Sequence, residues 1–142
     1  MILDKQNELS NAQAVTVSAA SVNQIDQGPN AYTGNARGQG RGLIFFNIDT
    51  DFTAAGEATM QFALRSSPNA DMSGAITHLL TAPIPVAQLK RGNSLRNAGV
   101  TLPMVGMTQR YVDVQYIVAN GPFTAGNVSA RFALDQPNSV GA

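Results

Sequence analysis

The sequence contains no cysteine and no tryptophan among its 142 residues. Without cysteine the chain has no disulfide framework and no thiolate for catalysis or metal binding. The lack of tryptophan disfavours a site in which sugars stack on aromatic rings. Neither absence prevents folding, because a chain of this length buries roughly 68–70% of its unfolded surface without metals or disulfides. We therefore expect one domain held together by its own core.

Charged residues are also scarce. They make up 13% of the chain, against roughly 25% in soluble domains, and nine basic residues balance nine acidic ones. Nucleic-acid binders with a basic face and disordered acidic tails both need more charge of one sign, so we expect no nucleic-acid partner. The charge is replaced by Ala, Asn, Gln, Ser, Thr and Gly, a composition that suits a protein covered by protein neighbours in a permanent assembly.

Long apolar runs are missing as well. No segment approaches the ~20 apolar residues of a membrane span, so we expect no membrane partner. The first residues, MILDKQNELSNA, lack the basic region and the apolar run of a signal peptide. We expect residues 1–12 to form an N-terminal arm whose apolar tip, Ile2 and Leu3, docks on another molecule.

One stretch of the sequence occurs twice. Residues 52–64 read FTAAGEATMQFAL and residues 123–134 read FTAGNVSARFAL. Gly56 and Gly126 each stand eight residues after an apolar strand residue and six before a phenylalanine. Equal lengths predict two antiparallel β-hairpins of equal register, whether by duplication or by convergence on similar turn chemistry.

Apolar residues alternate with polar ones on both sides of these glycines, as in strands packed on one face. The alternating residues are Ile44, Phe46 and Ile48; Ala58, Met60, Phe62 and Leu64; Val112, Val114, Tyr116 and Val118; and Val128, Ala130, Phe132 and Leu134. Residues 14–25 predict one long strand or two short ones, with Val17 and Val22 in the apolar pattern. Residues 75–82 predict another strand, which ends at Pro83.

Residues 85–92, PVAQLKRG, are typical of a single helical turn with Leu89 facing inward. Short extended pieces are expected around Leu95 and over residues 100–102. Short strands, turns rich in glycine and proline, and no long amphipathic helix predict an all-β antiparallel sandwich or barrel of about eight strands. We assign residues 13–135 to this domain and residues 136–142 to a polar C-terminal tail.

A long loop covers residues 26–42, DQGPNAYTGNARGQGRG. As a phosphate-binding loop it lacks the lysine and the Ser/Thr of a nucleotide site, and Arg37 and Arg41 are too few for counterion-driven nucleic-acid binding. The favoured interpretation is a loop that contacts a protein neighbour or is simply solvated. Tyr32, Arg37 and Arg41 are its candidate contact residues.

Catalytic chemistry has little support. His78, the single histidine, lies inside a predicted strand without an orienting partner at a telling spacing, which favours a structural role. Asp49, Asp51 and Glu57 are the best carboxylate cluster, and three carboxylates near one turn could supply half of a calcium shell. The equivalent loop over residues 119–122 has no carboxylate, so the turn does not need a metal. We expect no enzyme activity, no cofactor and no metal site.

Three segments, MILDKQNELSNAQAV, PVAQLKRG and VANGPFTAGNVSARF, resemble the capsid cement, or decoration, proteins of tailed bacteriophages of the Bordetella-phage type. The similarity runs from residue 1 to about residue 134 in order and spacing. It implies a jelly-roll sandwich, made in the host cytoplasm, that sits on the outer surface of an HK97-like shell. The implied partners are the major capsid protein and further copies of the chain, as a homotrimer or homodimer.

The candidate interface residues are Ile2, Leu3, Tyr32, Arg37, Arg41, Phe52 and Phe123. The alternative for the two phenylalanines is that each ring folds back onto its own strands. Two other functions stay open at this point. One is a β-sandwich carbohydrate- or receptor-binding module of a phage particle, and the other is an enzyme with an unrecognised site around Asp49, Asp51 and His78.

Overall fold

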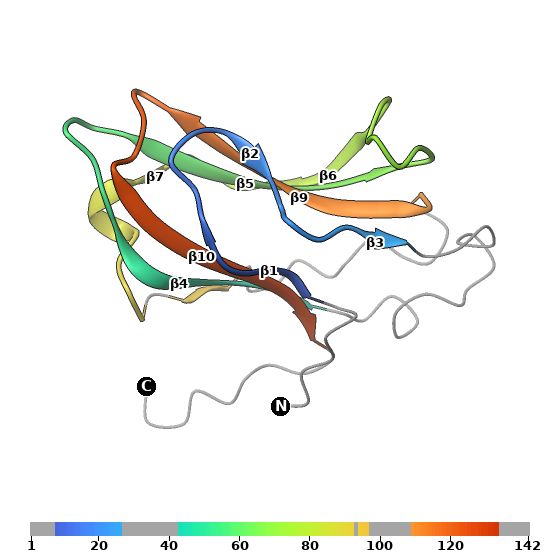
Figure 1. Ribbon diagram of the computed structural model, residues 1–142, viewed down its shortest axis with the longest axis horizontal. Helices are drawn as coiled ribbons and strands as arrows, with labels where there is room; N and C mark the ends of the chain where they lie inside the picture. The colour runs from blue at the N-terminus through green and yellow to red at the C-terminus, as the bar shows by residue number, and fades with distance from the viewer. Residues whose placement is uncertain (1–7, 27–42, 93, 97–108, 134–142) are drawn as a thin grey trace.

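The computed structural model describes residues 8–26, 43–92, 94–96 and 109–133 (Figure 1). Almost all of the regular structure is extended, as the alternation predicts. The elements are β1 (Glu8–Ala14), β2 (Ala19–Ala20), β3 (Ile25–Asp26), β4 (Leu43–Thr53), β5 (Thr59–Ser67), β6 (Ile76–Leu80), β7 (Ile84–Pro85), the 3₁₀ turn η4 (Val86–Gln88), β8 (Ser94–Arg96), β9 (Tyr111–Ala119) and β10 (Ala125–Ala133). No helix in these ranges is long and apolar enough to cross a membrane.

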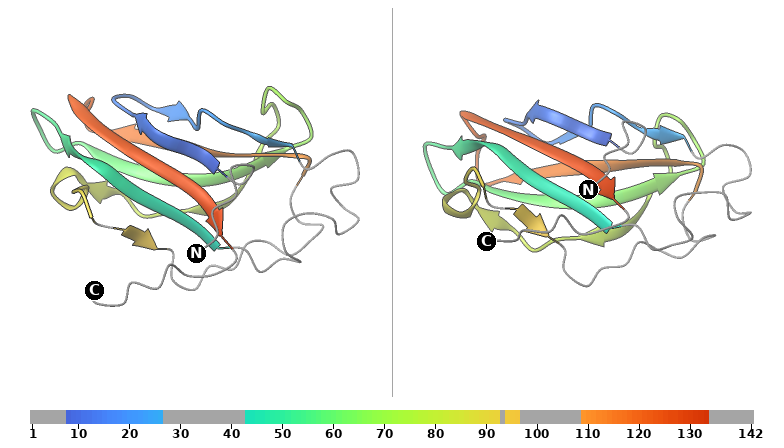
Figure 2. Two further views of the ribbon diagram at one scale, coloured as in Figure 1. Left: turned by 60° about the horizontal axis from the view of Figure 1, so that its bottom comes forward. Right: turned by 90° about the horizontal axis from the view of Figure 1, so that it is seen from below.

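The strands form two antiparallel sheets that pack face to face (Figures 1 and 2). Sheet A has the order β1-β10-β4-β8, and sheet B has the order β2-β9-β5-β6. The short strands β2 and β3 pair with successive parts of β9, and β6 and β7 pair with successive parts of β5. Each pair therefore fills one strand position, which leaves eight positions. Their order is that of a jelly roll, so the predicted fold is confirmed.

The prediction of two hairpins is wrong. Strand β4 belongs to sheet A and β5 to sheet B, while β9 belongs to sheet B and β10 to sheet A. Each predicted hairpin, β4–β5 or β9–β10, is thus an arch that crosses from one sheet to the other. The arches pair with one another instead of with themselves, β4 with β10 and β5 with β9. Alternation fixes which face of a strand is buried but not which strand lies beside it, so the sequence pattern is the same for both arrangements.

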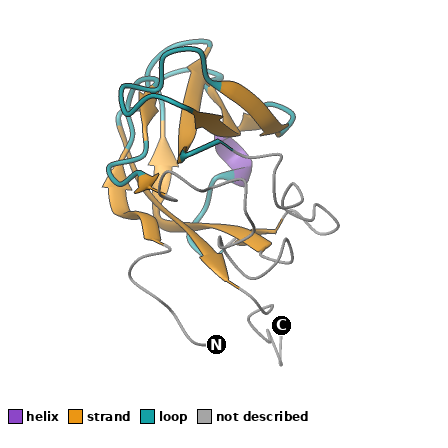
Figure 3. Cartoon of the chain, turned by 90° about the vertical axis from the view of Figure 1, so that its right-hand side faces the viewer, coloured by secondary structure: helices purple, strands orange, loops and turns teal. Residues whose placement is uncertain are grey.

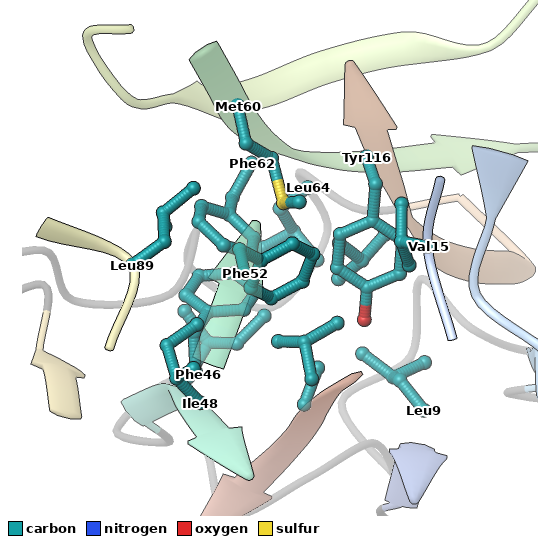
Figure 4. Packing of buried hydrophobic residues seen from close by; sticks show 14 of the residues in the cluster. Leu9, Val15, Phe46, Ile48, Phe52, Met60, Phe62, Leu64, Leu89 and Tyr116 are labelled. Carbon is teal, nitrogen blue, oxygen red and sulfur yellow. The ribbon is translucent and has the colours of Figure 1, made fainter. Parts of the chain in front are cut away.

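The predicted inward faces do form the core between the sheets (Figure 4). Phe46 of sheet A packs on Phe62 of sheet B with ring centroids 4.5 Å apart, and Phe62 meets Tyr116 edge to face at 5.6 Å. The other fully buried members from the repeated arches include Ile48, Met60, Leu64, Val114 and Val128. Contacts between aromatic rings contribute about 0.5–1.5 kcal/mol beyond the burial of their area, so this aromatic row stabilises the contact between the layers.

The N-terminal strand departs from the predicted domain boundary. Residues 8–12 are part of the sandwich and not of an arm, because β1 pairs with β10 and buries Leu9 and Ser10 completely. After β1, Val15 and Ile25 enter the core as expected. Val17 and Val22 are exposed instead, at 59% and 73%, because the chain between β1 and β3 pairs with β9 over only two residues at β2.

The predicted helical turn is confirmed as η4 (Figure 3). Pro85 precedes it with extended backbone, and Leu89 follows it with its side chain fully buried. The amide of Val86 donates to the carbonyl of Ala58, and the amide of Phe52 donates to the carbonyl of Leu89. The turn therefore fastens both ends of the connection between β4 and β5.

Candidate functional site

The side chains of Phe52 and Phe123, two of the predicted contact residues, do not lie on the surface. Both rings are almost fully buried and meet edge to face, with centroids 5.0 Å apart and an interplanar angle of 70°. The alternative interpretation, in which the rings fold back onto the strands, is the correct one for both. The hydroxyls of Thr53 and Thr124 bond beside them at 2.7 Å, so the two repeated Phe-Thr pairs tie the arches together.

The two glycines of the repeat are not equivalent. Gly126 has a φ of +141°, and a Cβ atom there would lie 2.3 Å from Cδ1 of Phe52. Gly56 has neither a positive φ nor an atom within 4 Å of such a Cβ. Only Gly126 is required by close packing, since the buried Phe52 ring occupies the space of a side chain.

The predicted contacts Ile2, Leu3, Tyr32, Arg37 and Arg41 lie outside the described residues. The C-terminal tail over residues 136–142 and the piece around residues 100–102 lie outside them too. Leu95 falls within β8, as expected.

A buried polar cluster joins β1 to β9 through the core. The Tyr116 hydroxyl and Ser10 Oγ are 2.7 Å apart, and Ser10 Oγ donates to Gln13 Oε1. Gln13 Oε1 also accepts the amide of Val22, and its Nε2 donates to the carbonyl of Ala20. Burial is the main cause that raises the pKa of the Tyr116 phenol far above its usual range. The cluster therefore positions the N-terminal strand and stays neutral at ordinary pH.

Two of the three clustered carboxylates, Asp49 and Asp51, have protein partners. Asp49 accepts hydrogen bonds from Ser129 Oγ and Asn47 Nδ2, and Ser129 Oγ accepts the amide of Ala12. Asp51 accepts the amide of Arg91. Among the described residues no group of three or more acidic or histidine side chains is arranged to hold a metal ion. Asp49 thus links β4 to β10, and the Ser129 bond extends the link to β1.

His78 lies against Ser66, with Nε2 within hydrogen-bond distance of Oγ, and Ser66 Oγ also accepts the amide of Gln109. Ser66 is fully buried. Burial lowers the pKa of His78 from its ordinary value. A hydroxyl without access from solvent is poorly placed to attack a substrate, so the pair's evident task is to join β5, β6 and the start of β9.

The outer face of sheet B is defined by the residues that alternate with its core-facing ones: Gln61, Ala63, Arg65, Leu80, Asp113, Gln115 and Ile117. Its charges are paired, because Arg65 binds the buried Asp113 through two hydrogen bonds of 3.0 and 2.6 Å. Leu80, on the terminal strand β6, pairs with Ala63 and is 53% exposed.

Comparison with known proteins gives one result. No curated protein matches the chain. A family model described as Bbp16, a name that points to a Bordetella phage protein, matches residues 9–132. The match runs from the buried Leu9 of β1 to Phe132 of β10, so it spans the sandwich except for one residue at each end. The chain therefore belongs to the Bbp16 family.

Proposed function

We propose that this protein is a phage capsid cement protein that binds the outer surface of an HK97-like shell and stabilises contacts between major capsid protein subunits. Membership of the Bbp16 family across residues 9–132 is the observation that carries the proposal. The resemblance of the three sequence segments to cement proteins points in the same direction. The protein acts by contact alone, as a homotrimer or homodimer, without a catalytic site or a cofactor.

The surface of the sandwich supports a role in contact. The cores of protein interfaces are depleted of unpaired charge, because each charge must lose its hydration. The outer face of sheet B offers two glutamines, Leu80 and Ile117, with Arg65 and Asp113 already paired. The proposed contact with the shell therefore lies on this face.

Repetition converts a modest contact into durable attachment. An interface of standard size buries about 1,600 Å² in total. A dimer or trimer repeats that contact two or three times, and the second contact forms at the high effective concentration set by the first. Loss of the protein then requires all contacts to break together.

Sedimentation tests the proposal. The purified protein should sediment as a discrete oligomer and should co-sediment with empty capsids of its phage. Leu80→Lys, on the outer face of sheet B, should reduce the bound fraction. Thr50→Lys, at an exposed position of β4, is the matched control and should bind normally. A stable monomer that does not bind capsids would refute the cement role, and binding to a glycan array instead would favour a receptor-binding module.

A further inference from the structure

The connection between β9 and β10 carries a reactive dipeptide. Asn120 is the one asparagine of the chain that is followed by glycine. Both Asn120 and Gly121 are exposed, with φ values of +62° and +104°. A Cβ at Gly121 would meet no atom within 4 Å, so the surroundings leave the backbone of this turn open to solvent.

We propose that Asn120 is a site of spontaneous deamidation. The backbone nitrogen of Gly121 attacks Cγ of Asn120, and a new C–N bond closes a five-membered succinimide ring. The side-chain nitrogen leaves as ammonia, taking up the proton that the Gly121 amide gives up. Water then opens the ring at either carbonyl and produces aspartate or isoaspartate at position 120. Glycine favours the attack, because it has no side chain to hinder the approach and its backbone adopts unusual angles readily.

The fold should tolerate the product. Where the ring opens to aspartate, the turn keeps its shape, because aspartate, like asparagine, adopts positive φ at little cost. Where it opens to isoaspartate, the main chain gains one methylene group within an exposed turn. The connection is also held from its C-terminal side, where Phe123 donates its amide to Thr16 and Thr124 donates its amide to Thr53. The buried Phe123 ring anchors the same segment in the core.

The consequence is a change of charge at one end of the sandwich. The formal net charge of the chain is zero at pH 7, so one deamidation makes it −1. Ala119 pairs with Thr59, which places Asn120 close to the connection that carries Glu57. Deamidation thus adds a second negative charge near Glu57, at the end of the sandwich that carries the connection between β4 and β5. The inference does not depend on the cement role.

Peptide mapping tests whether Asn120 deamidates, and a second asparagine in the same peptide serves as the control. Trypsin cleaves after Arg110 and Arg131, so residues 111–131 form one peptide with two asparagines. Asn127 is half-buried in β10 and precedes Val128, whose branched side chain hinders ring closure. The folded protein is incubated in warm, mildly alkaline buffer, and fragmentation spectra locate any mass gain of about one unit.

The expected result is a mass gain at residue 120 that grows with time, while Asn127 stays unchanged. An acidic species should rise in parallel on ion exchange and elute with the Asn120→Asp protein. Asn120→Gln should show no such species, since glutamine closes the larger ring slowly. Asn120 remaining intact while the unfolded chain reacts, or equal reaction at both asparagines, would overturn the proposal. The time course of the unaltered protein decides it even if a variant fails to fold.

Discussion

The two glycines of the repeat allow a matched test of the arch packing. Gly126→Ala places a methyl group 2.3–2.7 Å from three carbons of the Phe52 ring, where ordinary contacts are about 3.5–4.0 Å. Phe52 has little room to yield, because it is fully buried and meets Phe123 on another side. Overpacking a core costs about 1–3 kcal/mol, and a non-glycine residue held at a strained positive φ costs about 1–3 kcal/mol more.

The predicted loss for Gly126→Ala is therefore roughly 2–6 kcal/mol, a large part of the 5–15 kcal/mol that ordinarily separates folded from unfolded domains. At about 3–5 °C per kcal/mol for a chain of this size, the Tm should fall by roughly 6–30 °C. Gly56→Ala meets no atom and no strained φ, so it should change the free energy of unfolding by no more than about 1 kcal/mol.

Urea denaturation followed by circular dichroism measures both losses. A third protein, Gly126→Ala combined with Phe52→Leu, tests the cause. Leucine lacks the ring that the new methyl group strikes, so the double variant should lose less stability than the sum of the two single variants. Equal effects of the two glycine substitutions, or strict additivity in the double variant, would refute the packing described for Gly126.

Three further predictions concern the N-terminal strand and the single histidine. Leu9→Ala should cost about 2–5 kcal/mol in urea denaturation, while Val17→Ala, at an exposed position, should cost less than about 0.5 kcal/mol; a small loss for Leu9 would mean that β1 is dispensable. Tyr116→Phe should lower the free energy of unfolding by about 0.5–1.5 kcal/mol, because the hydrogen bond to Ser10 is lost. In a protein that already carries Ser10→Ala, the same substitution should cost nothing further, which would confirm that bond as the cause. The pKa of His78 is lowered by burial, so the unfolded chain binds its proton at a higher pH than the folded chain. The stability it contributes is present above its ordinary pKa and is lost as the pH falls, so Tm should decrease between about pH 7.5 and about pH 5.5. His78→Gln should flatten that slope, and an unchanged slope would assign it to other groups.

The sequence was a good guide to which residues face the core. The alternation at Ile44, Phe46 and Ile48 and at Val112, Val114 and Tyr116 is reproduced residue by residue, because a strand between water and a core has no other way to place its side chains. The turn after Pro85 was also predictable, since proline fixes its own φ and glycine readily takes the positive φ that ends a helical turn.

The wrong predictions have a common cause: contacts between residues distant in the chain leave no pattern in the local sequence. Leu9 looked like part of a polar arm because its partner strand begins more than a hundred residues later, at Ala125. For Phe52 and Phe123 the sequence left open whether each ring is a contact residue or folds back onto its own strands, because each is flanked by turn residues. Their mutual contact across the two arches, which the local sequence does not reveal, accompanies their burial. Val17 and Val22 continued an apolar pattern although β2 is too short to bury them.

The arches also give a physical reason for the repeat itself. Because β4 lies on β10 and β5 lies on β9, both connections must cross between the sheets at the same end of the sandwich, and both arches need matching lengths. Register shifts near Asn127 absorb the small mismatch that remains. The Phe-Thr pairs recur because they meet, ring against ring and hydroxyl against hydroxyl. Packing keeps the sequences of two stretches that stack in this way similar, whether or not they share an origin. Their similarity is therefore no evidence for duplication.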